Sequence, residues 1–247
     1  MELKKLIQKR WTSSASQYGK LVRDQLDNEG GSWLKYMNKH FQPEPGAKIL
    51  ETCCGPGFLS ILLSGDGRIV VGVDENEAML SEAAKNAESR NADVSFMQMD
   101  CHSLEFADES FDFVVTRNSL WTLYNPAGAY KEWIRVLKPG GKMIVFDSAW
   151  GHEYHCPGAM EKKRSLRKNN GLPVTDGEVF FGDAGLAQEL AVRTILGKHE
   201  RPDWDFNVLC KNKMEIEIDD RAWESIWSEE TKKYYSYAPM FMIKAVK

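Results

Sequence analysis

A short glycine turn is the first feature of the sequence whose residue types and spacing could do chemistry. Gly55 and Gly57 follow the apolar run Ile49-Leu50, which predicts a short buried strand, and a helical stretch begins at Phe58. Glycines let the backbone approach a ligand closely, and the first N–H groups of the following helix are free to bind it. A tight strand-to-helix turn without any ligand fits the same spacing, so this motif alone leaves both interpretations open.

Acidic residues follow the next two predicted strands. The β-branched run 68–73 predicts a second strand and is followed by Asp74, and 94–99 predicts a third strand followed by Asp100 and Cys101. An acid after the second strand can accept both hydroxyls of a ribose, although solvated aspartates are also common at strand ends. Asp100 and the backbone N–H of Cys101 are placed to meet the amine and a ring nitrogen of an adenine.

Strands that alternate with helices must position these residues. Further strands are predicted at 48–50, 111–116 and 142–147, with helices at 58–63, 77–90 and 127–137, the last closed by Pro139-Gly140-Gly141. This order predicts an α/β fold with a parallel sheet and right-handed crossovers. The candidate residues would then share the edge at which parallel strands end, where such sheets bind ligands.

The flanking segments follow other patterns. The first 43 residues are predicted to be helical with an interruption at 28–31, and the proline- and glycine-rich run 43–46 ends this region. Residues 149–202 are predicted to be mainly helix and loop. The runs 214–218 and 239–246 predict two closing strands, joined through a loop as a hairpin on one sheet edge.

Four motifs in order resemble the class I S-adenosylmethionine-dependent methyltransferases, in the small-molecule branch similar to methyltransferase type 11. They are ILETCCGPG, GVDENEAML, MDCHSLEFADESFDFVVTRNSL and EWIRVLKPGGKMIVFD, which together span about 46–148. The resemblance implies a Rossmann-like three-layer sandwich around a mostly parallel seven-stranded sheet of order 3-2-1-4-5-7-6. An antiparallel C-terminal hairpin strand and an N-terminal helical cap complete this fold. It also implies one domain over 1–247, with a helical segment (1–45), a cofactor-binding core (46–148), an acceptor-side insertion (149–205) and closing strands (206–247).

The resemblance assigns S-adenosyl-L-methionine as cofactor, S-adenosyl-L-homocysteine as product, and a role to each motif residue. The implied cofactor residues are Glu51, Gly55 and Gly57 for the methionine part, Asp74 for the ribose, Glu75 and Met79 near the adenosine, Asp100 and Cys101 for the adenine, and Asn118 near the sulfonium and amino-acid end. Tyr18, with Trp11, resembles the N-terminal aromatic segment that closes over the cofactor in many relatives. Packing of these two aromatic rings on the core is an equal alternative.

Cys53 is the one departure from the family pattern. It stands where the family usually has glycine. If that position requires a positive φ, a cysteine there is strained. This departure keeps open an alternative function, a non-catalytic S-adenosylmethionine-binding or regulatory protein with a degenerate glycine motif.

No catalytic residue is evident, because methyl transfer requires a base only when the acceptor is protonated at the working pH. The candidates for a general base are His152 and His155, in a polar loop after the fifth predicted strand. A metal site in this loop is not predicted, since the spacing matches no strong zinc pattern. The basic run 161–168 is read as a solvated helix face, with binding of an anionic acceptor as the alternative.

Composition limits the remaining functions. The net charge is −4, so no basic field favours nucleic acid, and five cysteines without a plausible pairing pattern indicate free thiols in a reducing compartment. No stretch has the length or apolar character of a signal peptide or a membrane span. A cytoplasmic monomer or homodimer acting on a small molecule, one that could be anionic, is therefore expected.

A nicotinamide-dependent dehydrogenase is the main rival enzyme. It would need a third glycine where this chain has Ser60, and it would not explain Asp100. A thiol-based arsenite methyltransferase stays open through Cys156 and Cys210, but the surrounding segments do not resemble that group. The identity of the methyl acceptor cannot be read from the sequence.

Overall fold

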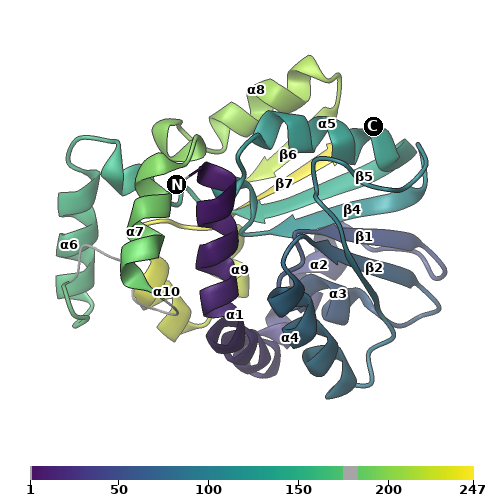
Figure 1. Cartoon of the computed structure of the whole chain (residues 1–247), viewed down its shortest axis with the longest axis horizontal. Helices are drawn as coiled ribbons and strands as arrows, with labels where there is room; N and C mark the ends of the chain where they lie inside the picture. Colours follow the sequence, from purple (N-terminus) through teal and green to yellow (C-terminus); the bar gives the residue numbers. More distant parts are fainter. Residues whose placement is uncertain (1, 175–182) are drawn as a thin grey trace.

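The computed structural model describes residues 2–174 and 183–247, and its centre is a seven-stranded sheet (Figure 1). The strand order is β3-β2-β1-β4-β5-β7-β6. The strands are β1 (Lys48–Thr52), β2 (Ile69–Asp74), β3 (Ser95–Gln98), β4 (Phe111–Arg117), β5 (Leu137–Asp147), β6 (Glu215–Asp219) and β7 (Phe241–Val246). Strand β7 pairs antiparallel with β5 and β6, whereas the other pairs are parallel. The predicted order and the antiparallel closing strand are confirmed.

Helices cover both faces of this sheet. They are α1 (Leu3–Asn28), α2 (Gly30–His40), α3 (Phe58–Leu63), α4 (Glu77–Glu88), α5 (Pro126–Val136), α6 (Ala159–Asn169), α7 (Ala184–Arg193), α8 (Asp203–Lys211), α9 (Ala222–Ile226) and α10 (Glu229–Tyr235). Three short 3₁₀ turns, η1 (Leu120–Thr122), η2 (His152–Tyr154) and η3 (Leu196–Lys198), lie in the connections. The result is a three-layer sandwich.

The side-chain alternation of the strands divides the core into two clusters. In β1, Ile49 packs with α2, α3 and α9 on one face of the sheet, while its neighbour Leu50 packs with α5 and α8 on the other. Both side chains are fully buried, as expected for parallel strands covered on both faces. The strand ends are therefore held rigidly between two apolar layers.

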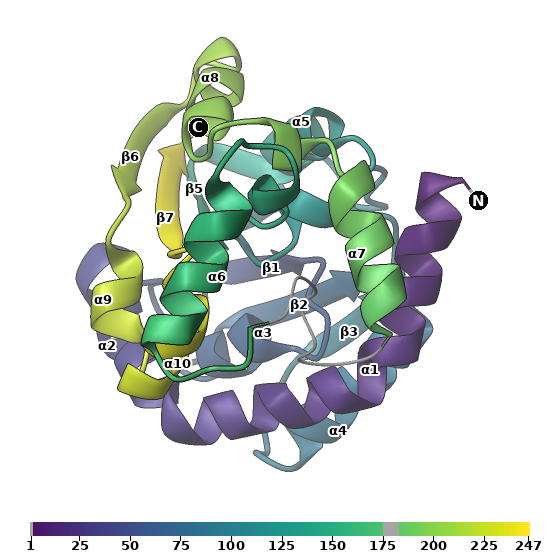
Figure 2. The same cartoon turned by 90° about the vertical axis from the view of Figure 1, so that its left-hand side faces the viewer.

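The N-terminal helical cap lies across the edge at which the parallel strands end. The predicted interruption is confirmed, since α1 ends at Asn28 and α2 begins at Gly30. Figure 2 shows α1, α6, α7 and α10 arranged around this edge. Segments from both ends of the chain and from the region after β5 therefore surround the place where the candidate residues lie.

Two local predictions differ from the structure. Strand β5 begins at Leu137, which pairs with Phe111, and the ladder resumes at the pair Lys142 and Phe113, so the Pro-Gly-Gly turn is a bulge inside the strand and not a helix end. The connection between β6 and β7 holds two short helices where a simple loop was expected. Part of the helix-and-loop region predicted for 149–202, residues 175–182, lies outside the described residues.

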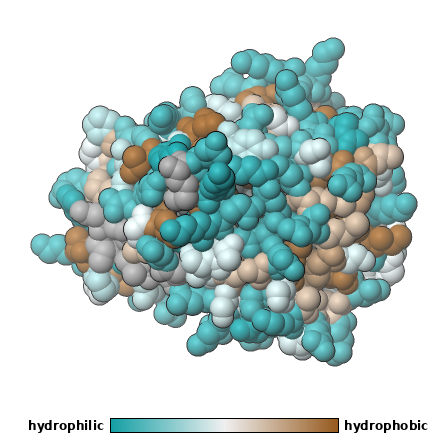
Figure 3. All heavy atoms as spheres, in the orientation of Figure 1, coloured by the Kyte–Doolittle hydropathy of each residue, from teal (hydrophilic) through white to brown (hydrophobic). Residues whose placement is uncertain are grey.

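The exposed surface seen in Figure 3 is mostly hydrophilic, with apolar side chains in small groups. Among the described residues, no helix is both long enough and apolar enough to span a membrane.

Candidate functional site

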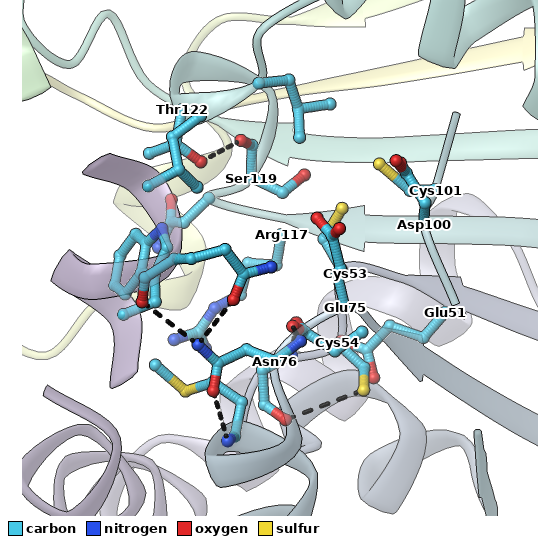
Figure 4. Close-up of a pocket in the computed structure, with 18 of the residues that line it drawn as sticks. Glu51, Cys53, Cys54, Glu75, Asn76, Asp100, Cys101, Arg117, Ser119 and Thr122 are labelled. Atoms are coloured by element: carbon cyan, nitrogen blue, oxygen red, sulfur yellow. Dashed lines mark hydrogen bonds between the residues drawn. The ribbon is translucent and has the colours of Figure 1, made fainter. Parts of the chain in front are cut away.

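A cavity opens at the carboxyl edge of the sheet, beneath α1. Its volume is about 920 Å³, including space open to solvent. Every predicted cofactor residue except Gly57 lines it, namely Tyr18, Glu51, Cys53, Gly55, Asp74, Glu75, Met79, Asp100, Cys101 and Asn118. Figure 4 shows Cys53, Asp100 and Cys101 on one side of this opening and Ser119 and Thr122 on the other. We call this space the glycine-turn cavity.

The two glycines of the turn after β1, Gly55 and Gly57, have different roles. Gly55 has a φ of 50°, and a Cβ atom there would lie on the cavity side of the turn, in van der Waals contact with the ring of Tyr18 at 3.6 Å. Gly57 is the N-cap of α3, with a φ of 82°, and a Cβ atom there would lie 3.0 Å from Phe96. Gly55 therefore keeps the cavity open, whereas Gly57 permits the helix to pack on the sheet and does not line the cavity.

Asp74 is fixed beside this turn, as the sequence predicts. Its carboxylate accepts hydrogen bonds of 2.9 Å from the backbone N–H of Gly55 and of Asn76. Burial raises the pKa of Asp74 to about 6, and the two N–H donors only partly oppose this rise. A carboxylate held in this way presents its remaining lone pairs to the cavity, where a diol could donate to them.

Asp100 also lines the cavity, but protein groups already occupy its oxygens. Oδ2 accepts from Lys4 at 2.8 Å and from the Tyr124 hydroxyl at 3.0 Å, and Oδ1 accepts from the backbone N–H of His102 at 2.9 Å. Burial raises the pKa of Asp100, but Lys4 and His102 lower it more, so the net pKa lies well below the ordinary range. An adenine amine would have to share this ionised carboxylate with Lys4 and Tyr124.

Cys53 adopts the conformation that the family glycine would adopt. Its φ is 52°, in the left-handed region, so the position does require positive φ. Its thiol interacts with that of Cys101, and this contact raises the pKa of Cys53 while it lowers the pKa of Cys101. The strain foreseen from the sequence is therefore present, and the backbone turn is retained.

Glu51 lies at the base of the cavity and is 2% exposed. It accepts a 2.7 Å hydrogen bond from the backbone N–H of Ser60 and a second one from the Ser60 hydroxyl at 2.5 Å. Burial raises the pKa of Glu51 to about 7, against the opposing effects of Ser60 and Arg117. Glu51 can therefore change its charge near neutral pH when a cation such as an amino group arrives.

A second cavity, here called the aromatic cavity, adjoins the first one. Its volume is about 680 Å³, including space open to solvent. Trp11, Tyr18, Arg117 and Asn118 line both cavities. The other lining residues are mostly aromatic or polar: Leu21, Gln25, Glu29, Trp33, Trp121, Trp150, Trp227, Thr231, Tyr235 and Met240. Trp11 and Tyr18 therefore form part of both cavity walls, while Tyr18 also packs against the core, and closure over a cofactor stays a prediction.

Asn118 holds the boundary between the two cavities. Its φ is 52°, and its backbone N–H donates to Phe146 at 2.8 Å. The indole of Trp121 donates to its backbone carbonyl at 3.1 Å, and the indole of Trp150 lies 3.3 Å from its side-chain oxygen. The sequence placed Asn118 at the end of a strand, but it gave no sign that two tryptophans would be anchored there.

The structure does not bring His152 and His155 into either cavity. His152 faces Glu200, with Nε2 at 3.5 Å, and the ring of His155 packs against Gly197 near the carbonyl of Ala191. Ligand atoms of His152, Cys156 and Glu200 lie within 4.8 Å of one another, a grouping that the sequence spacing did not indicate. A catalytic role for either histidine stays a prediction without geometric support.

The basic run 161–168 is only partly a solvated face. It forms most of α6, where Lys163 turns inward and is 1% exposed beside Glu153, with Nζ to Oε1 at 2.6 Å. Arg167 is likewise buried and donates to the carbonyl of Pro173 at 2.8 Å. Lys163 and Arg167, two cations of this run, therefore stabilise the position of α6.

Several cavity residues were missed from the sequence. On α1, Lys4 and Gln8 line the cavity at helical spacing with Trp11, which was predicted, and that periodicity could have revealed them. His102 and Arg117 also line it, but nothing in their local pattern separates them from ordinary polar residues after a strand. Their position depends on the packing of α1 over the sheet.

Comparison with known proteins agrees with this geometry. Residues 50–145 match the family model described as "Methyltransferase domain". The chain is 30% identical over 149 residues to a demethylmenaquinone methyltransferase of Staphylococcus carnosus, a match that covers 59% of this chain and 61% of that protein. It is 35% identical over 120 residues to the Staphylococcus aureus enzyme of the same name, covering 47% and 49%. The chain thus matches about half to three fifths of the length of these curated relatives.

Two solved structures share the fold. One is geranyl diphosphate C-methyltransferase from Streptomyces coelicolor in complex with Mg²⁺, geranyl diphosphate and S-adenosyl-L-homocysteine, with a TM-score of 0.59, 16% identity, and coverage of 93% of this chain and 84% of that one. The other is a methyltransferase from Aquifex aeolicus, with a TM-score of 0.56, 16% identity, and coverage of 92% and 97%. At these identities the likeness concerns the fold.

Proposed function

We propose that the chain, whose residues 50–145 match the methyltransferase domain model, is a class I S-adenosylmethionine-dependent methyltransferase that transfers a methyl group to a small-molecule acceptor. The observation that carries the proposal is the position of Asp74, whose carboxylate is held by the N–H of Gly55 at the wall of the glycine-turn cavity. A ribose diol needs an acceptor of this kind beside a turn that has no side chain in the way. The volume of about 920 Å³ leaves room for a nucleoside with an amino-acid tail.

In the proposed complex, each wall of the glycine-turn cavity holds one part of the cofactor. Asp74 and Glu75 would bind the ribose, Met79 and Cys101 would enclose the adenine, and Glu51 would face the methionine end. Because Asp100 is already bonded to Lys4 and Tyr124, we assign it the role of fixing this end of the cavity rather than that of a free adenine ligand.

S-adenosylmethionine, held by the residues named above, would supply an activated methyl group on a sulfonium, and S-adenosylhomocysteine would be the leaving group when the methyl group passes to the acceptor. The chain must therefore hold the acceptor in line at about 3–3.5 Å and exclude water. Trp11, Tyr18 and Asn118, which line both cavities, are placed to do this. No general base among the described residues is required by this proposal.

The aromatic cavity is the proposed acceptor site. It adjoins the glycine-turn cavity at Asn118, the residue assigned to the sulfonium end of the cofactor. The staphylococcal relatives are demethylmenaquinone methyltransferases, which supports a small molecule as the acceptor.

Calorimetric titration with S-adenosylhomocysteine, with NAD as the control ligand, tests the cofactor assignment. We expect micromolar binding of the former alone. Asp74→Ala should weaken it by about tenfold or more, since charge-assisted hydrogen bonds to the ribose are lost. Glu88→Ala, which removes an exposed carboxylate from the last turn of α4, is the matched control and should bind normally.

Two outcomes would contradict the proposal in different ways. No binding by the wild-type protein would exclude the cofactor, and equal affinity in Asp74→Ala would exclude the ribose assignment. Binding without methyl transfer to any acceptor would favour the alternative function, a non-catalytic or regulatory S-adenosylmethionine-binding protein. The positive φ of Cys53 does not by itself support this alternative, because the turn keeps its shape.

A further inference from the structure

The aromatic cavity contains two buried hydrogen-bond donors that have no acceptor among the described residues. They are Nη1 of Arg117 and Nε1 of Trp33. Arg117 is 8% exposed and Trp33 is 2% exposed, and both line this cavity. Burying a donor without a partner is costly, and most strongly so for a charged one, so native folds rarely retain such groups without a use.

The position of Arg117 is fixed by its other contacts. Its guanidinium carbon lies 3.9 Å from the ring centroid of Phe58 and 5.3 Å from that of Trp33. Its Nη2 donates to Gln25 at 2.7 Å. Stacking and one hydrogen bond thus hold the group in place while Nη1 stays available, so a small adjustment can deliver this donor to a ligand.

The acidic groups near Arg117 are engaged elsewhere. Glu51 holds Ser60, as described above. Glu29, the carboxylate of the aromatic cavity, accepts from the backbone N–H of Ser228 at 3.1 Å and from the Thr231 hydroxyl. Glu29 therefore anchors the start of α10, and no hydrogen bond between it and Arg117 occurs in the described part of the chain.

Trp33 indicates which ligand these donors serve. Arg117 lines both cavities, but Trp33 lines only the aromatic one. Both residues therefore belong to the wall of the aromatic cavity, on the acceptor side of Asn118. A ligand group that satisfies both must be an acceptor of hydrogen bonds, and beside a guanidinium an anionic oxygen satisfies them best.

The remaining wall favours a flat ligand. Ring centroids of Trp150 and Tyr235 lie 5.5 Å apart, and those of Trp227 and Tyr235 lie 5.7 Å apart. On the other side, Trp11 and Trp121 meet at 6.3 Å. Aromatic faces and edges of this kind pack well on planar unsaturated molecules.

We propose that the methyl acceptor is a planar aromatic molecule bearing an anionic oxygen, a carboxylate or an ionised hydroxyl, which Arg117 and Trp33 recognise. This inference rests on the proposed function and specifies its substrate class. It assigns to Arg117 and Trp33 the selection of the acceptor, and it does not state which atom is methylated.

Three probes of one shape and different charge test this inference. 2-Naphthoate, 2-naphthylmethanol and 2-naphthylmethylammonium are titrated calorimetrically at pH 8 into the protein saturated with S-adenosylhomocysteine. We expect the anion to bind at least about tenfold more tightly than the alcohol, and the cation to bind most weakly. Preference for the cation, equal binding of all three, or no binding of the anion would each overturn the proposal.

Variants then identify the groups responsible. Arg117→Gln should bring the ratio of the affinity for the anion to the affinity for the alcohol close to one. Arg117→Lys should retain part of the preference for the anion. Trp33→Phe removes the unpartnered donor together with part of the buried ring, and should reduce the ratio by about threefold. Trp204→Phe is the matched control, because Trp204 lies on α8 and lines neither cavity, and it should leave the ratio unchanged.

S-adenosylhomocysteine binding by each variant separates the two proposals. Arg117→Gln should bind it within about threefold of wild type. If its affinity for S-adenosylhomocysteine falls as much as its affinity for naphthoate, Arg117 serves the cofactor and the inference is wrong. If the wild-type protein binds no S-adenosylhomocysteine, the proposed function fails, and the probe ratios measured without it still decide whether the cavity selects anions. Trp33→Phe keeps the test valid if Arg117→Gln does not fold.

Discussion

The ammonium group of Lys4 lies 2.8 Å from Oδ2 of Asp100 and also pairs with Glu75, at 2.7 Å. These contacts join the first turns of α1 to the ends of β2 and β3, across the glycine-turn cavity that the same three residues line. A single cation on the N-terminal helix therefore closes one side of the proposed cofactor site.

The Lys4 contacts should control how fast the cofactor leaves. Lys4 is 46% exposed, and exposed ion pairs contribute about 0.2–1 kcal/mol. We therefore expect Lys4→Ala to increase the dissociation rate of S-adenosylhomocysteine by no more than about fivefold, measured by stopped-flow tryptophan fluorescence. Lys5→Ala, which removes the neighbouring exposed cation, is the control. Identical dissociation rates in the two variants would show that these ion pairs do not hold the cavity closed.

Cofactor binding should release a proton from Asp74 below about pH 6. Burial raises the pKa of this carboxyl to about 6, so the free protein carries a proton there at lower pH. The ribose hydroxyls need the ionised form, so affinity should fall as the pH falls through this value, by up to about tenfold per pH unit. Calorimetric titration at pH 5.5 in two buffers of different ionisation enthalpy measures how many protons are released when the cofactor binds.

Protons that Glu51 exchanges with solvent must be excluded from that measurement, because burial raises the pKa of Glu51 to about 7. The comparison is therefore between Glu51→Gln and the double variant Glu51→Gln/Asp74→Asn. The first should still release a proton on binding and the second should not. Equal proton release by both would show that Asp74 does not titrate with the cofactor.

Cys101 should be unusually reactive for a buried thiol. The contact with Cys53 is the main cause of its lowered pKa, and His102 contributes. Alkylation of Cys101 by iodoacetamide, followed by peptide mass spectrometry, should therefore have a pH midpoint below about 8.5. In Cys53→Ala the midpoint should move upward, while exposed Cys210 is the internal reference. A midpoint that stays in place would show that Cys53 does not activate this thiol.

Arg201 should be essential for stability although it lies away from both cavities. It is 1% exposed and pairs with two buried carboxylates, Asp147 at 2.9 Å and Asp205 at 2.8 Å. Arg201→Met leaves both without a cation, so we expect a loss of about 3–5 kcal/mol in the free energy of unfolding, measured with urea. Arg221→Met, which breaks an exposed pair with Glu224, is the control and should leave the free energy of unfolding almost unchanged. Similar losses in the two variants would contradict the buried network.

The network around Arg201 also bears on the mechanism. Asp147 is the last residue of β5, at the sheet edge where Asp74 ends β2 and Asp100 follows β3. In the structure it is 1% exposed and held by Arg201. Its role is therefore structural, and this distinction depended on a partner 54 residues away in the chain.

The sequence by itself determined the alternating strand and helix pattern, the glycine turn and the acids at the strand ends. These features are local, because apolar periodicity and turn residues act over a few positions. The order of strands followed from the family resemblance, and the structure confirms it. The sequence left open whether Cys53 has a positive φ, and the structure shows that it does.

Tertiary structure alone decided what closes the cavities and what is left unpaired inside them. Lys4 reaches Asp100 across 96 positions of sequence, and Glu29 meets Thr231 across 202. No local pattern records such contacts, because they depend on how α1 crosses the sheet edge. The unpartnered donors of Arg117 and Trp33 are of the same kind, since a missing hydrogen-bond partner is a property of the packed molecule and not of any segment of its sequence.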